Sequence, residues 1–291
     1  MLPSSSLQNI FNVLVDLCVV AAIVAGIFVH RPRHVLAWYL FAIGMAVMSA
    51  GDALWAIEFL GIEYPYPSLA DVLYVGSIPF FVGGLLLIGR RGIGRNGGNL
   101  IDPLIVAVGT GMLLWVLFME PVPLGYTPSL LERILSIVYL AAYVLMTAIL
   151  LRPLFVPEKR WPALYLLCGS LAAFFVGDLA FGSLTTGDFE AYEAGDLVYA
   201  GYLLGNALLG AAALHPSMVH LSEVASEAPE KLTWWRLVLL TGATLLAPCV
   251  LVLQALLGRP INVPLIVGGS AVLFLLVALR IAGMIGERRR S

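Results

Sequence analysis

Nine long runs of apolar residues constrain the fold of this chain more than any other feature of its sequence. A helix needs about 20 apolar residues to cross the hydrocarbon core of a bilayer, and backbone groups in lipid must find their hydrogen bonds within the same segment. The runs do not alternate as strands would, so each of them predicts a helix. They lie at 9–29, 35–57, 68–88, 101–119, 130–151, 162–183, 193–214, 233–256 and 262–284.

The predicted fold class is therefore an all-α integral membrane protein with about nine transmembrane helices, in one domain over residues 1–291. The composition agrees, because only 12% of the residues are charged, whereas soluble domains carry about 25%. The formal net charge of −2 says little about partners, and we expect no nucleic-acid partner. The three cysteines lie in apolar runs without a CxxC pair, so neither a disulfide nor a zinc site is expected.

Positive charge predicts the orientation of the helices. Of the 16 basic residues, all but Arg133 and Arg259 fall on one side of the predicted membrane, and that side is cytoplasmic by the positive-inside rule. The N-terminus is then outside the plasma membrane and the C-terminus is in the cytoplasm. Tryptophans near the two surfaces are expected to be interfacial anchors. These are Trp38, Trp161, Trp234 and Trp235 on the inner side, and Trp55 and Trp115 on the outer side.

An internal repeat underlies this arrangement. The stretch beginning "GDALW" at residue 51 matches the stretch beginning "GDLAF" at residue 177 with one residue of slip. Because four helices make an even number, the two copies would have the same orientation. We expect repeats at 9–119 and 130–256, followed at 262–291 by a last span and the start of a cytoplasmic connector. The alignment pairs Asp52 with Asp178, Asp71 with Asp196, and Tyr74 with Tyr199.

Asp52 and Asp178 are the most informative polar residues, because a carboxylate inside a membrane needs a partner or a water-filled pocket. Gly51 and Gly177 precede them and would permit close approach of a neighbouring helix. The sequence leaves two interpretations open. Each aspartate holds helices together through a tyrosine or a backbone group, or the pair faces an outward-open polar cavity that binds a ligand.

Other polar residues extend this hypothetical ligand site. Asp71 and Asp196 fall in the first turn of their helices, where a carboxylate caps free N–H groups. Asn206 is more typical of a hydrogen bond between helices than of a ligand contact, and Asp16 could line the same cavity. The candidate ligand-binding residues are Asp16, Asp52, Trp55, Asp71, Tyr74, Asp178, Asp196, Tyr199 and Asn206.

No motif predicts an enzyme, a cofactor or a metal. "GIGRNG" at 92–97 fits a dinucleotide-binding pattern only literally, because no strand precedes it. His30 and His34 are separated by Pro32, so they cannot share a helical face. His215 and His220 have no carboxylate in register. A Ser-His-Asp order, an HExxH motif and a P-loop are all missing from the sequence.

Several strings resemble the multi-pass N-terminal membrane region of actinobacterial GGDEF and EAL signalling proteins. They include "YPSLADVLYVGSIPFFVGGLLLIGRR", "LIDPLIVAVGTGMLLWVLFMEP" and "GDLVYAGYLLGNALLGAAALHPSM", and the resemblance extends over about residues 35–290. It implies a sensory region whose last span leads through a charged helix, here "LVALRIAGMIGERRRS", towards a cytoplasmic domain that makes or degrades cyclic di-GMP. The sequence contains no GGDEF or EAL string, so no catalytic activity is carried over.

The resemblance and the charge pattern together predict a sensor or transducer, either part of a longer protein or a relative that acts through a partner. A sensor needs a ligand with different affinities for two packings of its bundle. The expected partners are the lipid bilayer, a small ligand at the outer face, a cytoplasmic output domain and a second copy of the chain. The alternative is a small-molecule or proton-coupled transporter or channel, since carriers also contain parallel repeats and intramembrane carboxylates.

Overall fold

The structure is a computed structural model that describes residues 4–33, 35–58, 67–90, 101–118, 129–151, 161–185, 196–222, 234–256 and 263–288. Within these ranges the chain is almost entirely helical and contains no strand. The all-α class is therefore confirmed. The helices are α1 (Ser4–His30), α2 (Leu36–Glu58), α3 (Leu69–Arg90), α4 (Ile101–Phe118), α5 (Leu130–Leu151), α6 (Pro162–Thr185), α7 (Asp196–Leu214), the 3₁₀-helix η4 (Pro216–Ser222), α8 (Trp234–Leu256) and α9 (Val263–Arg288).

Each predicted apolar run coincides with a described α-helix, and the differences lie at the ends. Helix α1 begins at Ser4, several residues before the apolar run, and α9 continues to Arg288. Four helical segments are long and apolar enough to cross a membrane: Gln8–His30, Leu36–Ile57, Leu69–Ile88 and Leu130–Leu151. The other described helices contain shorter apolar stretches.

Local side-chain chemistry fixes several helix ends. Ser68 caps α3: its Oγ accepts a hydrogen bond from the N–H of Ala70, while its own N–H donates to Oδ2 of Asp71 over 2.8 Å. The capping role predicted for Asp71 is thereby confirmed. The same device begins α5, where the N–H of Glu132 donates to Oγ of Ser129. Helix α1 ends at His30, and the next residue, Arg31, has a left-handed φ of 47°.

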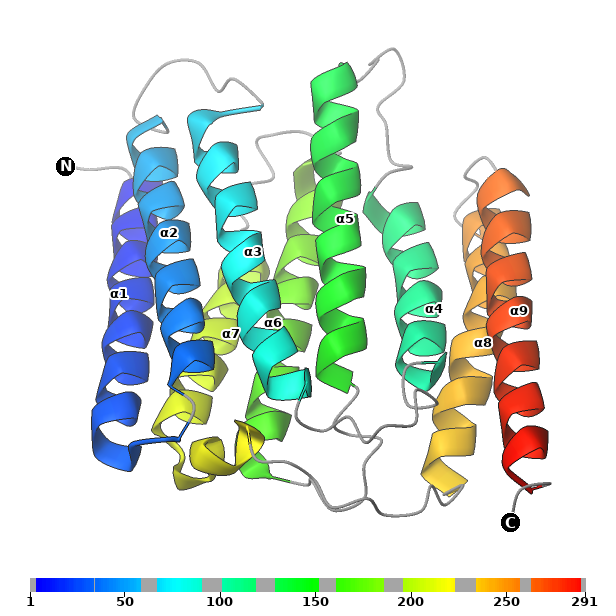
Figure 1. Ribbon diagram of the computed structural model, residues 1–291. Helices are drawn as coiled ribbons and strands as arrows, with labels where there is room; N and C mark the ends of the chain where they lie inside the picture. Colours follow the sequence, from blue (N-terminus) through cyan, green and yellow to red (C-terminus); the bar gives the residue numbers. More distant parts are fainter. Residues whose placement is uncertain are drawn as a thin grey trace.

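The helices stand side by side in one bundle, with α1 and α2 at one edge and α8 and α9 at the other (Figure 1). The most extensive contacts join α2 to α3 and α6 to α7. Helix α1 packs on both α2 and α7, and α5 packs on α3 and α4. Helix α4 also contacts α8 and α9, so it connects the larger group of helices to the C-terminal pair.

Two apolar clusters correspond to these two groups. The larger is built from α1, α2, α3, α5, α6, α7 and η4, and its fully buried members include Ile23, Met45 and Leu164. The smaller joins α4, α8 and α9. Trp38 belongs to the larger cluster, is 0% exposed and packs edge-on against Phe41. The prediction that Trp38 anchors the chain at the membrane surface is therefore wrong, because neighbouring helices cover its ring.

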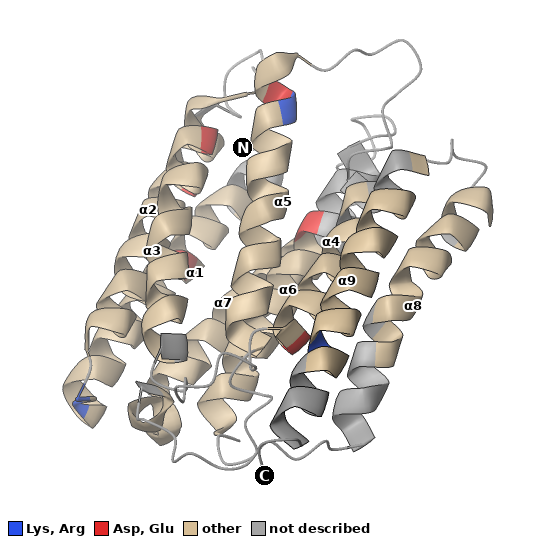
Figure 2. Cartoon of the chain, turned by 45° about the vertical axis from the view of Figure 1, so that its right-hand side comes forward, with Lys and Arg blue, Asp and Glu red and all other residues tan. Residues whose placement is uncertain are grey.

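The outward surface of the helices is also apolar. Leu14 on α1 is 55% exposed and Phe274 on α9 is 77% exposed. Figure 2 shows long uncharged stretches along the described helices, with acidic and basic residues only at isolated points. Monomeric soluble proteins rarely expose apolar surface on this scale. Such a surface is the one expected of helices that face lipid.

Candidate functional site

Gly51 and Asp52, which we call the first Gly-Asp step, lie where α2 meets α3. Gly177 and Asp178 form the second Gly-Asp step. The hydroxyl of Tyr74 on α3 donates a hydrogen bond to Oδ1 of Asp52 over 2.6 Å. Gly51 makes room for this contact, because a Cβ added there would lie 2.7 Å from a ring carbon of Tyr74. The glycine therefore leaves room for the tyrosine ring, and the aspartate accepts a hydrogen bond from the tyrosine hydroxyl. The close approach predicted at Gly51 is confirmed.

The second Gly-Asp step has the same construction between α6 and α7. The hydroxyl of Tyr202 on α7 donates to Oδ1 of Asp178 over 2.6 Å, and a Cβ at Gly177 would lie 3.0 Å from the Tyr202 ring. A second phenol, Tyr143 on α5, donates to Oδ2 of Asp178. Both oxygens of this carboxyl group thus have a tyrosine donor. The tyrosine equivalent to Tyr74 in this contact is Tyr202, whereas the sequence alignment pairs Tyr74 with Tyr199.

A different partner completes the first step. The carboxyl groups of Asp16 on α1 and Asp52 on α2 lie within hydrogen-bonding range of each other. Asp16 is 1% exposed, and its Oδ1 accepts a hydrogen bond of 2.7 Å from Nδ2 of Asn206 on α7. Asn206 therefore joins α7 to α1, as expected of an interhelical amide. On the same two helices, the hydroxyl of Tyr199 donates to Oδ1 of Asn9 over 3.1 Å.

Helix α5 connects the polar groups around the first Gly-Asp step with those around the second. The hydroxyl of Tyr139 donates a hydrogen bond to Oδ1 of Asp71 on α3 over 2.9 Å. Tyr143, which donates to Asp178, lies one turn further along α5. Tyr139 also lies within electrostatic range of both Tyr74 and Tyr143. Aspartate and tyrosine side chains thereby form a polar network that extends over α1, α2, α3, α5, α6 and α7.

The carboxyl groups of the hypothetical ligand site differ in their exposure. Asp16 and Asp71 are 1% and 8% exposed and are covered by neighbouring helices, whereas Asp52 and Asp178 are half-buried with tyrosine partners. Trp55 lies on α2 and is half-buried. Asp196 begins α7, but its side chain lies outside the described set.

Sequence reasoning missed Tyr139, Tyr143 and Asn9. A usable signal exists for the tyrosines: they are four residues apart in "YLAAY" and therefore share one face of a membrane helix. Buried phenols usually find a hydrogen-bond partner. Two of them on one face of α5 could have been assigned to the carboxyl groups of other helices. Asn9 gives no such signal, because it lies near the start of its run.

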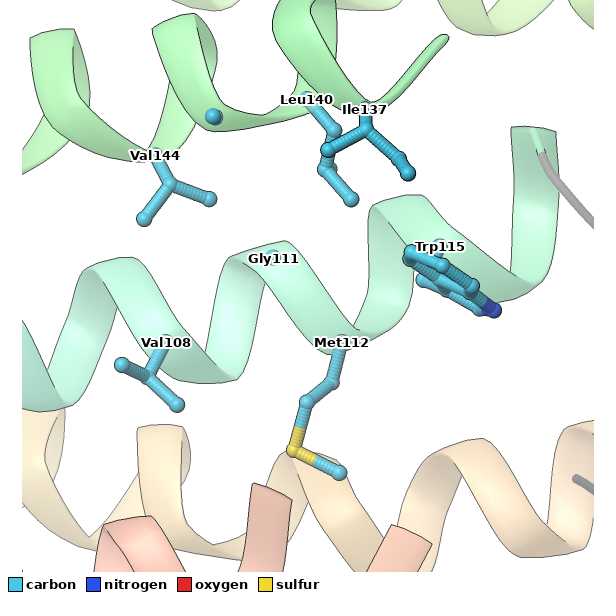
Figure 3. A pocket seen from close by; sticks show the side chains of 8 residues that line it. Val108, Gly111, Met112, Trp115, Ile137, Leu140 and Val144 are labelled. Carbon is cyan, nitrogen blue, oxygen red and sulfur yellow. The ribbon is translucent and has the colours of Figure 1, made fainter. Parts of the chain in front are cut away.

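The opposite face of α5 borders an apolar groove of about 300 Å³ (Figure 3). From α5 the groove is lined by Ile137, Leu140, Ala141 and Val144, and from α4 by Val108, Gly111, Met112 and Trp115. No charged side chain is among these lining residues. The α4–α5 contact therefore contains space in which the two helices could repack.

A buried ion pair joins α4 to α9. Nε of Arg280 lies 2.9 Å from Oδ1 of Asp102, and the two side chains are 6% and 0% exposed. Asp102 is in the first turn of α4 and Arg280 is near the end of α9. A charged pair sealed between helices fixes their register, because moving either charge away leaves its partner buried without compensation.

The apolar helices, their apolar outer surface and the buried polar network define a helical membrane protein. A more particular family is not indicated: searches against protein-family models, curated proteins and solved structures find no match for this chain.

Proposed function

We propose that the chain is a sensory and transducing module of the plasma membrane. It has nine spans, an outer N-terminus, a cytoplasmic C-terminus and two same-orientation repeats at 9–119 and 130–256. The start of α1 and the end of α9 lie at opposite ends of the bundle (Figure 1), which supports this topology. The similar construction of the two Gly-Asp steps supports the repeat. An outer or membrane-borne ligand acts on the polar network, and α9 carries the response inward.

The observation that carries this proposal is the position of α5 and α4 between the network and α9. Helix α5 holds Tyr139 and Tyr143 in the network and packs on α4. Asp102 of α4 forms the buried ion pair with Arg280 of α9. A ligand that changes the hydrogen bonds of the two tyrosines shifts α5 against the grooved face of α4, and α4 moves α9 with it. Interhelical shifts of about 1–2 Å are the usual size of such a change.

The route is tested by a distance measurement in the intact chain. Spin labels are placed at two exposed positions, Phe28 on α1 and Leu279 on α9, after replacement of the native cysteines, and the protein is studied in lipid nanodiscs. We expect Tyr143→Phe to shift the distance distribution by about 1–2 Å. The matched control is Tyr165→Phe, because Tyr165 is 49% exposed on α6. An unchanged distribution in Tyr143→Phe would contradict the proposal.

Signal output is tested by fusing the chain to a GGDEF domain, the class of output domain that the resemblance implies. A GGDEF domain fused after Ser291 is expected to make cyclic di-GMP at a rate that differs between wild type and Tyr143→Phe. The rate in Tyr165→Phe is expected to match wild type. Equal synthesis in all three proteins would argue against signalling through α9.

A proton-coupled transporter is the second candidate, and the pair of buried Asp16 and half-buried Asp52 favours it. Intramembrane carboxyl groups are the usual proton carriers of pumps and transporters. Proteoliposomes with an internal pH dye and an imposed membrane potential distinguish the two functions. Proton entry that requires Asp16 would support transport, while intact proteoliposomes without proton entry would leave the sensory proposal.

A further inference from the structure

The two Gly-Asp steps differ in one partner, and the difference concerns a proton. Asp178 accepts hydrogen bonds from two phenols, Tyr202 and Tyr143. Asp52 accepts one from Tyr74, and its other neighbour is the carboxyl group of Asp16. A tyrosine brings its own proton to the hydrogen bond. An ionised aspartate has none to donate, because a carboxylate is only an acceptor.

The described environment of Asp16 also lacks a hydrogen-bond donor for one of its carboxyl oxygens. Its side chain is 1% exposed, and Oδ1 accepts from Asn206. No N–H or O–H group in the described part of the chain donates to Oδ2. Two carboxylates that share a site cannot both stay ionised without a compensating cation. A hydrogen bond between Asp16 and Asp52 therefore requires one proton.

We propose that Asp16 and Asp52 form a binding site for a single exchangeable proton within the membrane region of the protein. The proton is carried by Oδ2 of Asp16 and is donated to the carboxylate of Asp52, which also accepts from Tyr74. The occupied pair keeps one negative charge, and release of the proton leaves two. Asp52 is half-buried, so exchange occurs through its side of the pair.

The described groups around the pair carry no positive charge that could replace the proton. Tyr74 faces it from α3 and Asn206 from α7, with Tyr199 and Asn9 bonded to each other on the same α1–α7 contact. Asp71, which lies within electrostatic range of Tyr74, accepts a hydrogen bond from Tyr139 and caps α3.

A small metal cation is the competing occupant. Oδ1 of Asn206 is also buried without a donor among the described residues, so oxygen atoms for a cation are present. The close approach of the two carboxyl groups favours the proton, because an ion between them would hold their oxygens apart. This proton site does not depend on whether the chain is a sensor or a transporter.

Infrared spectroscopy of the full chain in nanodiscs tests the site, since a protonated carboxylic acid has its own carbonyl band. Exposed aspartates and glutamates are ionised at about pH 7, so a band that persists there and shifts in D₂O reports a buried acid. We expect one such band in wild type, its loss in both Asp16→Asn and Asp52→Asn, and its retention in Asp178→Asn. Asparagine supplies a fixed N–H in place of the bound proton, so the first two variants should fold.

A second measurement follows the stability of the same proteins with pH. The unfolded chain ionises both aspartates above about pH 4, so the folded state binds one proton more than the unfolded state. Stability then falls as pH rises, by about tenfold in the folding equilibrium constant per pH unit while the pair stays protonated. Asp16→Asn should lose this dependence. Wild type without the band, or variants that keep it, would overturn the proposal. So would a band that disappears at constant pH when sodium chloride replaces choline chloride, because the occupant would then be a metal cation.

Discussion

Gly51 and Tyr74 face each other so closely that a Cβ at residue 51 would lie 2.7 Å from the tyrosine ring. The next residue, Asp52, accepts a hydrogen bond from the hydroxyl group of that same tyrosine. Neighbouring positions on α2 thus contact the ring and the hydroxyl group of one tyrosine side chain. This explains why glycine directly precedes the aspartate, and the same explanation holds for Gly177, Asp178 and Tyr202.

Substitution of these glycines should destabilise the protein. Gly51→Ala forces the Tyr74 ring away from Asp52, and we expect a loss of about 1–3 kcal/mol in the free energy of unfolding, as for other overpacked sites. Gly201→Ala should cost more, because its Cβ would lie 2.7 Å from the backbone of Gly177, which cannot rotate aside. Denaturation by SDS in mixed micelles measures both losses.

Gly76→Ala is the matched control for this pair of variants. It lies on α3 near Tyr74, and a Cβ there meets nothing within 4 Å. Alanine is a better helix former than glycine by about 0.5–1 kcal/mol, so this variant should be as stable as wild type or slightly more stable. Equal losses in Gly51→Ala and Gly76→Ala would show that ring packing is not the reason for the glycine.

The sequence was sufficient for the helices and for most of the polar network. Apolar length predicts each helix because lipid leaves the backbone no other way to satisfy its hydrogen bonds. Asp52, Tyr74, Asp178 and Asn206 were recognisable because a polar group in such a helix needs a partner. The partners themselves depend on how helices rotate and pack, and that information is spread over the whole bundle.

Tyr199 and Tyr202 illustrate this limit. Both lie in the second repeat on α7, and the sequence match favours Tyr199 as the equivalent of Tyr74. In the structure, Tyr202 is the residue that donates a hydrogen bond to Asp178, whereas Tyr199 donates to Asn9 on α1. A residue three positions further along a helix lies on nearly the same face but almost one turn higher, so alignment alone could not choose between them.

The two tyrosine donors of Asp178 should act cooperatively. Removing one hydroxyl leaves the carboxylate with one donor, and Tyr143→Phe or Tyr202→Phe alone should cost about 1–2 kcal/mol. Removing both leaves a half-buried acceptor without either phenol, so the double variant should cost more than the sum of the single variants. A double-mutant cycle of unfolding free energies measures this coupling. A strictly additive result would contradict a shared role at Asp178.

Native cysteines offer a test of membrane insertion. Cys18 on α1 and Cys249 on α8 are exposed on the outer surface of the bundle, at positions that we assign to lipid. Thiols react as thiolates, which require water, so a hydrophilic maleimide should not label either residue in intact membranes. Detergent denaturation should make both reactive. Arg31→Cys, beyond the end of α1, is the positive control, and labelling of Cys18 at the rate of that control would contradict insertion of α1.

Variants of the ion pair between Arg280 and Asp102 distinguish its effect on stability from its effect on signalling. Loss of one buried charge leaves the other uncompensated, so Arg280→Met should cost about 3–5 kcal/mol. The paired replacement Asp102→Leu with Arg280→Met should recover most of that loss, since apolar residues often replace a buried ion pair without destabilisation. If the pair transmits movement from α4 to α9, the recovered protein should no longer show the distance change between α1 and α9 caused by Tyr143→Phe. A recovered protein that keeps the full change would exclude the ion pair from the route.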